Sequence, residues 1–219
     1  QGRDPRLMSE PFRTRSFTAV EPHLRPVRQR AAVRVIVTDG SSVLLLSDTD
    51  PGTPGTRWWV TPGGGIDPGE QPVQAACREL AEETGRIVEP LDLGGPLLRR
   101  LVIHGYSDQV LAQSELFYVL QVPAPFELDT SGFTEEEKLT IAAWDWHSID
   151  QLAALTEPVW PGDLAELVVG EAMLREGCEQ VEPTARRLCR RFTAEDLDAI
   201  SQAGLHEAHL QPARARPWV

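Results

Sequence analysis

The sequence is poor in the residues and patterns that mark several large classes of protein. It has three cysteines, Cys77, Cys178 and Cys189, among 219 residues. They are too few and too scattered for a disulfide framework or a zinc site. No apolar run approaches the roughly 20 residues that cross a bilayer, and no secretory signal is recognisable. These absences favour a cytoplasmic protein without a membrane partner.

Positive charge is also scarce. The chain has 21 Lys and Arg against 33 Asp and Glu, which gives a formal net charge of −12. This balance argues against a nucleic acid or an anionic membrane as the main partner. A small anionic substrate stays compatible with it, because a bound metal ion can invert the local field. A hydrophobic content of 41% is ordinary for a globular domain with one sizeable core.

The chain divides into four stretches. We expect residues 1–7, which precede Met8, to be a cloning remnant. Residues 8–29 are rich in Arg and Pro and predict an extended arm, whereas residues 30–176 show the periodicity of a folded domain. Residues 177–219 predict a helical extension, Thr184–Phe192 and Ala194–Ala203, followed by a tail. The arm and the C-terminal helices are the candidate surfaces for a homodimer.

Within residues 30–176, turn residues separate short β-rich runs from helical ones. The first two runs form a hairpin across Asp39–Ser42. The runs that predict strands are Ala32–Val37, Val43–Leu46, Trp58–Val60, Leu97–His104, Leu111–Val122 and Leu139–Trp146, with a further strand start at Arg86–Val88. The later stretches that predict helices are Ile149–Leu155 and Asp163–Arg175.

A Gly-rich loop followed by a helix forms the most informative stretch, from Gly64 to Gly85. Pro72 suits the first helical turn and Gly85 the position after the last one. The residues expected on the buried helix face are Val73, Ala76, Cys77, Leu80 and Thr84, and those on the opposite face are Glu79, Glu82 and Glu83.

The three glutamates break two local rules. Carboxylates three and four residues apart repel each other, and the last turn of a helix already carries partial negative charge. A hard divalent cation reverses the sign of both penalties, because it takes several carboxylate oxygens as ligands. The alternative without a functional site is a solvated acidic helix end.

The whole stretch resembles the Nudix box, G-x5-E-x7-R-E-U-x-E-E-x-G-U. Gly64, Glu70 and the run Arg78–Gly85 match every fixed position, and only the last apolar position differs, as Arg86. The resemblance covers roughly residues 30–176. It implies an α/β fold, a Nudix-type α/β/α sandwich with a mixed central sheet, to which the C-terminal helical extension is added.

The resemblance also implies a hydrolase that cleaves a phosphoanhydride bond in a nucleoside diphosphate linked to another moiety, or in a nucleoside triphosphate. Mg²⁺, or Mn²⁺ in its place, would be the cofactor. The implied ligands are the carbonyl of Gly63 and the carboxylates of Glu79, Glu82 and Glu83. The implied supporting residues are Gly64, Glu70, Arg78 and Gly85. The alternative is a catalytically weak domain that binds a nucleotide ligand or serves a regulatory role.

The catalytic base and the substrate contacts are less closely defined. Glu82 and Glu83 are candidates for the base within the box. Among later residues the resemblance favours the triplet Glu135–Glu137, in which we favour Glu136, with Glu115 as the alternative. The candidate substrate contacts, stacking aromatics and a phosphate-binding cation, are Trp59, Arg99 and Tyr106.

Overall fold

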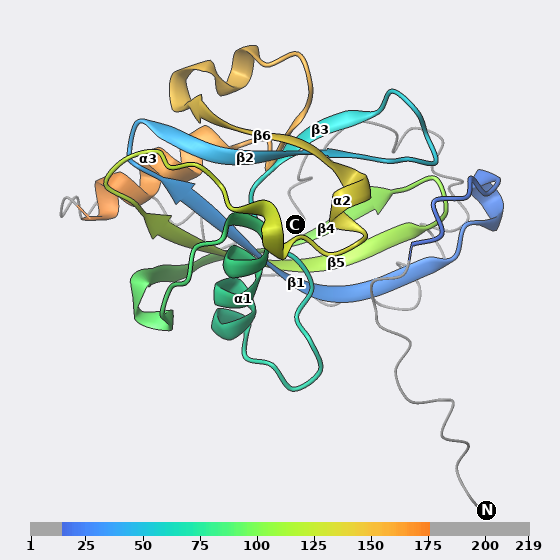
Figure 1. The fold of residues 1–219 in the computed structure, drawn as a ribbon, viewed down its shortest axis with the longest axis horizontal. Helices are drawn as coiled ribbons and strands as arrows, with labels where there is room; N and C mark the ends of the chain where they lie inside the picture. Colours follow the sequence, from blue (N-terminus) through green and yellow to red (C-terminus); the bar gives the residue numbers. More distant parts are fainter. Residues whose placement is uncertain (1–14, 176–219) are drawn as a thin grey trace, which may run out of the picture.

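The computed structural model describes residues 15–175, which form a mixed seven-stranded sheet with helices on both faces (Figure 1). The strands are β1 (Val27–Thr38), β2 (Ser42–Thr49), β3 (Arg57–Val60), β4 (Leu93–Gly105), β5 (Val110–Gln121), β6 (Ile141–Ser148) and β7 (Val159–Trp160). The α-helices are α1 (Pro72–Thr84), α2 (Glu137–Thr140) and α3 (Leu164–Arg175). Short 3-10 turns cover Pro22–Leu24, Pro90–Asp92, Thr130–Gly132 and Ile149–Ala154.

The sheet has the order β4-β5-β1-β2-β3-β7, with β6 on β2. The central strand β1 is parallel to β5 along its whole length, from Val27 beside Val110 to Thr38 beside Gln121. The pairs β1–β2, β2–β3, β2–β6 and β4–β5 are antiparallel, and β3–β7 is parallel. The mixture of directions confirms the mixed sheet expected from the sequence.

Alternate residues of β1 face the two helical layers, because side chains of a strand alternate between its faces. Val33, Val35 and Val37 pack with Ala76 and Leu80 of α1. On the other face, Ile36 packs with Leu164 and Val168 of α3. The predicted α/β/α sandwich is therefore confirmed.

The helix α1 begins and ends where the sequence predicts. Pro72 is its first residue, and the side chain of Gln71 caps it in a reciprocal pair of hydrogen bonds with Gln74. Gly85 follows the last turn in a left-handed conformation, and its N–H donates to the carbonyl of Ala81.

Three local predictions were wrong or incomplete. Arg86–Val88 is not a strand, since Ile87 is 87% exposed and Pro90 begins a 3-10 turn just beyond it. The predicted strand Leu139–Trp146 begins only at Ile141, because Leu139 and Thr140 belong to α2. The short helix predicted after it is present as a 3-10 helix, Ile149–Ala154. The sequence reading also missed the two-residue strand β7, which is too short to show periodicity.

The described part of the N-terminal arm packs against the folded domain of the same chain. The guanidinium of Arg15 pairs with the carboxylates of Asp50 and Asp108, each at 3.0 Å, and lies over the ring of Tyr106. The two helices predicted after residue 177 lie outside the described residues. In residues 15–175, no helix combines the length and the apolar character that crossing a membrane requires.

Candidate metal centre

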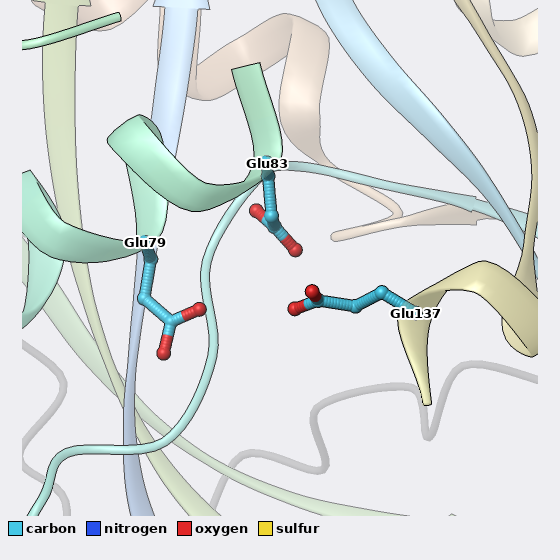
Figure 2. Close-up of side chains that lie close together, drawn as sticks. All are labelled: Glu79, Glu83 and Glu137. Carbon is cyan, nitrogen blue, oxygen red and sulfur yellow. The ribbon is translucent and has the colours of Figure 1, made fainter. Parts of the chain in front are cut away.

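Three carboxylates from two helices converge beside the loop that precedes α1. Glu79 and Glu83 lie one turn apart on α1, and Glu137 approaches them from α2 (Figure 2). One carboxylate oxygen from each residue lies within 4.8 Å of the other two. Glu79 and Glu83 are 1% and 5% exposed, so these two residues do not form a solvated acidic helix end. We call these three residues the carboxylate cluster.

The cluster is electrostatically unfavourable on its own. Burial raises the pKa of Glu83 well above its usual value, and the charges of Glu79 and Glu137 raise it further. The hydrogen bond that Glu83 Oε2 accepts from the N–H of Gly63, at 2.6 Å, acts in the opposite direction. A divalent cation would offset this repulsion. A donor set made of carboxylate oxygens fits hard ions such as Mg²⁺ and Mn²⁺.

The loop before α1 passes so close to β1 and to Glu79 that two of its positions have no room for a side chain. Gly63 has a φ of 132°, and a Cβ there would lie 2.3 Å from the carbonyl oxygen of Val33. A Cβ on Gly64 would lie 2.6 Å from Oε2 of Glu79. Gly63 therefore allows the loop to pass against β1, and Gly64 allows it to pass beside Glu79.

Arg78 fixes several acidic side chains at once. Its Nη1 donates to Glu79 at 2.8 Å and to Glu82 at 3.3 Å. Its other nitrogens donate to both carboxylate oxygens of Glu70, at 2.9 and 3.0 Å, and to the carbonyl of Gly65. The hydrogen bond to Glu70 is the largest of several effects that raise the pKa of Arg78. The structure thus places Glu82 against Arg78 and outside the carboxylate cluster.

The late glutamates lie in different surroundings. Glu135 pairs with Lys138 at the surface, and Glu136 is the residue just before α2. The carboxylate of Glu137 accepts from the N–H and the hydroxyl of Thr134, at 2.7 and 2.8 Å. The N–H of Glu137 donates back to that hydroxyl. This capping box, readable as T-x-x-E in the sequence, is the signal that could have singled out Glu137.

Glu115 lies in the interior of the sheet, fully buried, as the partner of Arg34 on β1. Although burial acts to raise it, the positive charge of Arg34 holds the pKa of Glu115 below its usual value. The sequence reading did not name Arg34, which also donates to the carbonyl of Gly63 at 3.0 Å. That carbonyl is the one predicted as a metal ligand.

The structure does not bring the three candidate substrate contacts together. Trp59 packs its ring edge-on against His147, with centroids 4.4 Å apart, beside the core under α3. Arg99 is exposed on β4. Tyr106 lies beneath Arg15, whose guanidinium carbon is 4.0 Å from the ring centroid.

Comparison with known proteins places this site in a family. Residues 28–168 match the family model of the NUDIX domain. The chain is 31% identical over 104 residues to an RNA pyrophosphohydrolase of Bartonella quintana, a match that covers 44% of this chain and 60% of that protein. It is 41% identical over 71 residues to an RNA pyrophosphohydrolase of Brucella ovis, covering 30% of this chain and 39% of that one.

The chain thus spans about 40 to 60% of the length of these curated relatives. Among solved structures, it is similar to the Escherichia coli dihydroneopterin triphosphate pyrophosphohydrolase, with a TM-score of 0.49 and 21% identity. That similarity covers 67% of this chain and 97% of that one. The domain match alone extends over 141 of the 219 residues, from 28 to 168. The chain belongs to the Nudix hydrolase family.

Proposed function

We propose that this chain hydrolyses a phosphoanhydride bond in a nucleoside diphosphate linked to another moiety, or in a nucleoside triphosphate. The carboxylate cluster is the observation that supports this most directly, because its three acidic groups, two of them buried, have oxygens within 4.8 Å of one another, and a cation bound there would offset their repulsion. Phosphoryl transfer requires such a cation to neutralise charge that develops on the phosphate oxygens.

In this proposal Glu79, Glu83 and Glu137 hold Mg²⁺ or Mn²⁺. The bound ion would neutralise the phosphate oxygens and make a water molecule more acidic. Arg78 keeps Glu79 oriented through the 2.8 Å hydrogen bond, and Thr134 keeps Glu137 oriented through its cap. The ligand position that the sequence assigned to Glu82 thus passes to Glu137.

We assign proton acceptance from the attacking water to Glu82. It lies on the last turn of α1 beside Glu83 and keeps 29% exposure in its side chain. A base in this position differs from a ligand in one measurable way. Glu82→Gln is expected to lower kcat by about 100-fold or more with unchanged Mn²⁺ affinity, and a parallel loss of Mn²⁺ affinity would make Glu82 a ligand instead.

The relatives that are named RNA pyrophosphohydrolases suggest a second substrate class, the 5′-triphosphate end of RNA. The bond to be cleaved would be the same. The net charge of −12 favours the small nucleotide over the polyanion. The remaining alternative is a domain that binds a nucleotide without hydrolysing it.

A hydrolysis screen separates these functions. Wild-type protein is incubated with nucleoside diphosphate derivatives, nucleoside triphosphates and a 5′-triphosphorylated oligoribonucleotide, each with Mg²⁺, with Mn²⁺ and with excess EDTA. We expect metal-dependent cleavage of at least one small nucleotide and little of the oligonucleotide. Faster cleavage of the oligonucleotide would favour RNA. Nucleotide binding without cleavage under any condition would contradict the proposal.

A further inference from the structure

Arg34 is a buried cation that touches both the interior of the sheet and the loop beside the carboxylate cluster. The residue is 8% exposed. Its Nε donates to Glu115 at 3.0 Å, and its Nη1 donates to the carbonyls of Thr61 and Gly63 at 3.2 and 3.0 Å. One guanidinium therefore binds a carboxylate and two backbone carbonyls.

The carboxylate on the inner side of Arg34 is itself fixed. Glu115 accepts from the side-chain amide of Gln113 at 2.7 Å and from the indole N–H of Trp160 at 3.1 Å. With Arg34 these contacts occupy both carboxylate oxygens in a fully buried position. Glu115 is thus a rigid anchor for the guanidinium, and it is not placed to act as a mobile base.

The loop on the outer side is held by alternate donors of β1. The main-chain N–H groups of Val33 and Val35 donate to the carbonyls of Gly64 and Pro62, at 2.9 and 2.8 Å. The side chain of Arg34 donates to the carbonyls of Thr61 and Gly63, which alternate with these two. All four consecutive carbonyls of residues 61–64 are therefore held by three consecutive residues of one strand.

The same loop carries the hydrogen bond that fixes a proposed metal ligand. The N–H of Gly63 donates to Glu83 Oε2 at 2.6 Å. Because Gly63 adopts a φ of 132° that it could readily leave, its orientation depends on contacts at its neighbouring peptide groups. Arg34 supplies the contact on its carbonyl side.

We propose that Arg34 is a positioning residue for the metal centre, which it orders through Gly63 and Glu83. This inference rests on the proposed function. An ion pair buried only for stability gains little over an apolar pair of the same shape. A guanidinium has separate donors that reach a carboxylate and two carbonyls together, which neither an apolar side chain nor a single ammonium group reproduces.

The test compares Mn²⁺ affinity in three folded variants at a temperature well below unfolding. Arg34→Lys keeps the charge but loses the fork of donors. Arg34→Met combined with Glu115→Gln removes both charges, so that no lone charge stays buried. Arg15→Lys is the matched control, because Arg15 is an equally buried arginine whose partners, Asp50 and Asp108, lie outside the carboxylate cluster.

We expect both changes at Arg34 to weaken Mn²⁺ binding by about 10- to 100-fold, as the loss of residues that orient metal ligands typically does. Arg15→Lys is expected to lower the unfolding temperature with Mn²⁺ affinity within about twofold of wild type. Wild-type affinity in both Arg34 variants, or an equal loss in Arg15→Lys, would overturn the positioning role. If wild type itself binds no Mn²⁺ and hydrolyses no nucleotide, the proposed function is wrong, and the positioning role of Arg34 is wrong with it.

Discussion

The carboxylate cluster makes an unusual prediction about Glu137→Gln. This change should stabilise the metal-free protein and at the same time weaken its metal binding. The two effects have opposite signs because the glutamates repel each other until a cation is bound. A residue that only supported the fold would show a loss of stability instead, so the sign of the change decides between the two roles.

The magnitude follows from the geometry. At 4.8 Å, the upper limit of the separations between these oxygens, and an effective dielectric constant of about 20, two carboxylates repel by about 3.5 kcal/mol. Glu137 takes part in two of the three pairs, so its repulsion with all groups charged is about 7 kcal/mol. Burial and its charged neighbours raise the pKa of Glu83, and a proton there removes much of this repulsion. We therefore expect a gain of about 1 to 3 kcal/mol in unfolding free energy.

Thermal unfolding in EDTA measures this gain, at about 2 to 4 °C in Tm per kcal/mol. The capping contact with Thr134 survives the change, since the glutamine oxygen also accepts hydrogen bonds. Mn²⁺ affinity and nucleotide hydrolysis are measured on the same samples. Glu136→Gln is the matched control, one residue away. A lower Tm of Glu137→Gln in EDTA, or wild-type hydrolysis by it, would refute the reasoning.

Two further predictions concern the loop and the interior. Gly64→Ala places a Cβ 2.6 Å from Oε2 of Glu79, and we expect it to displace that carboxylate and reduce Mn²⁺ affinity by at least about 10-fold; unchanged affinity would show that the loop can retreat. Asp48 has a pKa raised from 3.8 to about 7 by burial. Its contribution to stability is therefore present below pH 3.8 and lost as the pH rises through 7. Between pH 4 and 8, the unfolding free energy of wild type should fall by about 1 to 3 kcal/mol relative to that of Asp48→Asn, as measured by chemical unfolding. This is less than the full pKa shift implies, because Asp48 keeps partial exposure to solvent. A constant difference across this range would contradict the burial of a charged Asp48.

The sequence predicted the parts of the site that are local. Pro72, the periodic apolar residues and Gly85 determine α1 from interactions within a few residues of each other, and the helix bounds agree. The glutamates of the last turn follow from the same local pattern. Most of the central sheet was predictable as well, because its longer strands are runs of apolar and β-branched residues.

The missing parts depend on contacts between distant stretches. Glu137 reaches the cluster from α2, more than 50 residues after the end of α1 in the sequence, and nothing in a polar turn specifies that approach. Arginine is mostly exposed in proteins, whereas Arg34 lies in the central strand β1 and is buried. Its burial depends on Glu115, 81 residues later, so single-strand periodicity could not reveal it.

The most direct test of the metal centre is the Mn²⁺ affinity of wild type and Glu83→Gln, measured by electron paramagnetic resonance on samples with matching circular dichroism. Glu83 contributes a buried carboxylate to the cluster and accepts the 2.6 Å hydrogen bond from Gly63. We predict a defined Mn²⁺ site in wild type and a loss of affinity of at least about 100-fold in the variant. Equal Mn²⁺ binding by the two proteins would contradict the account.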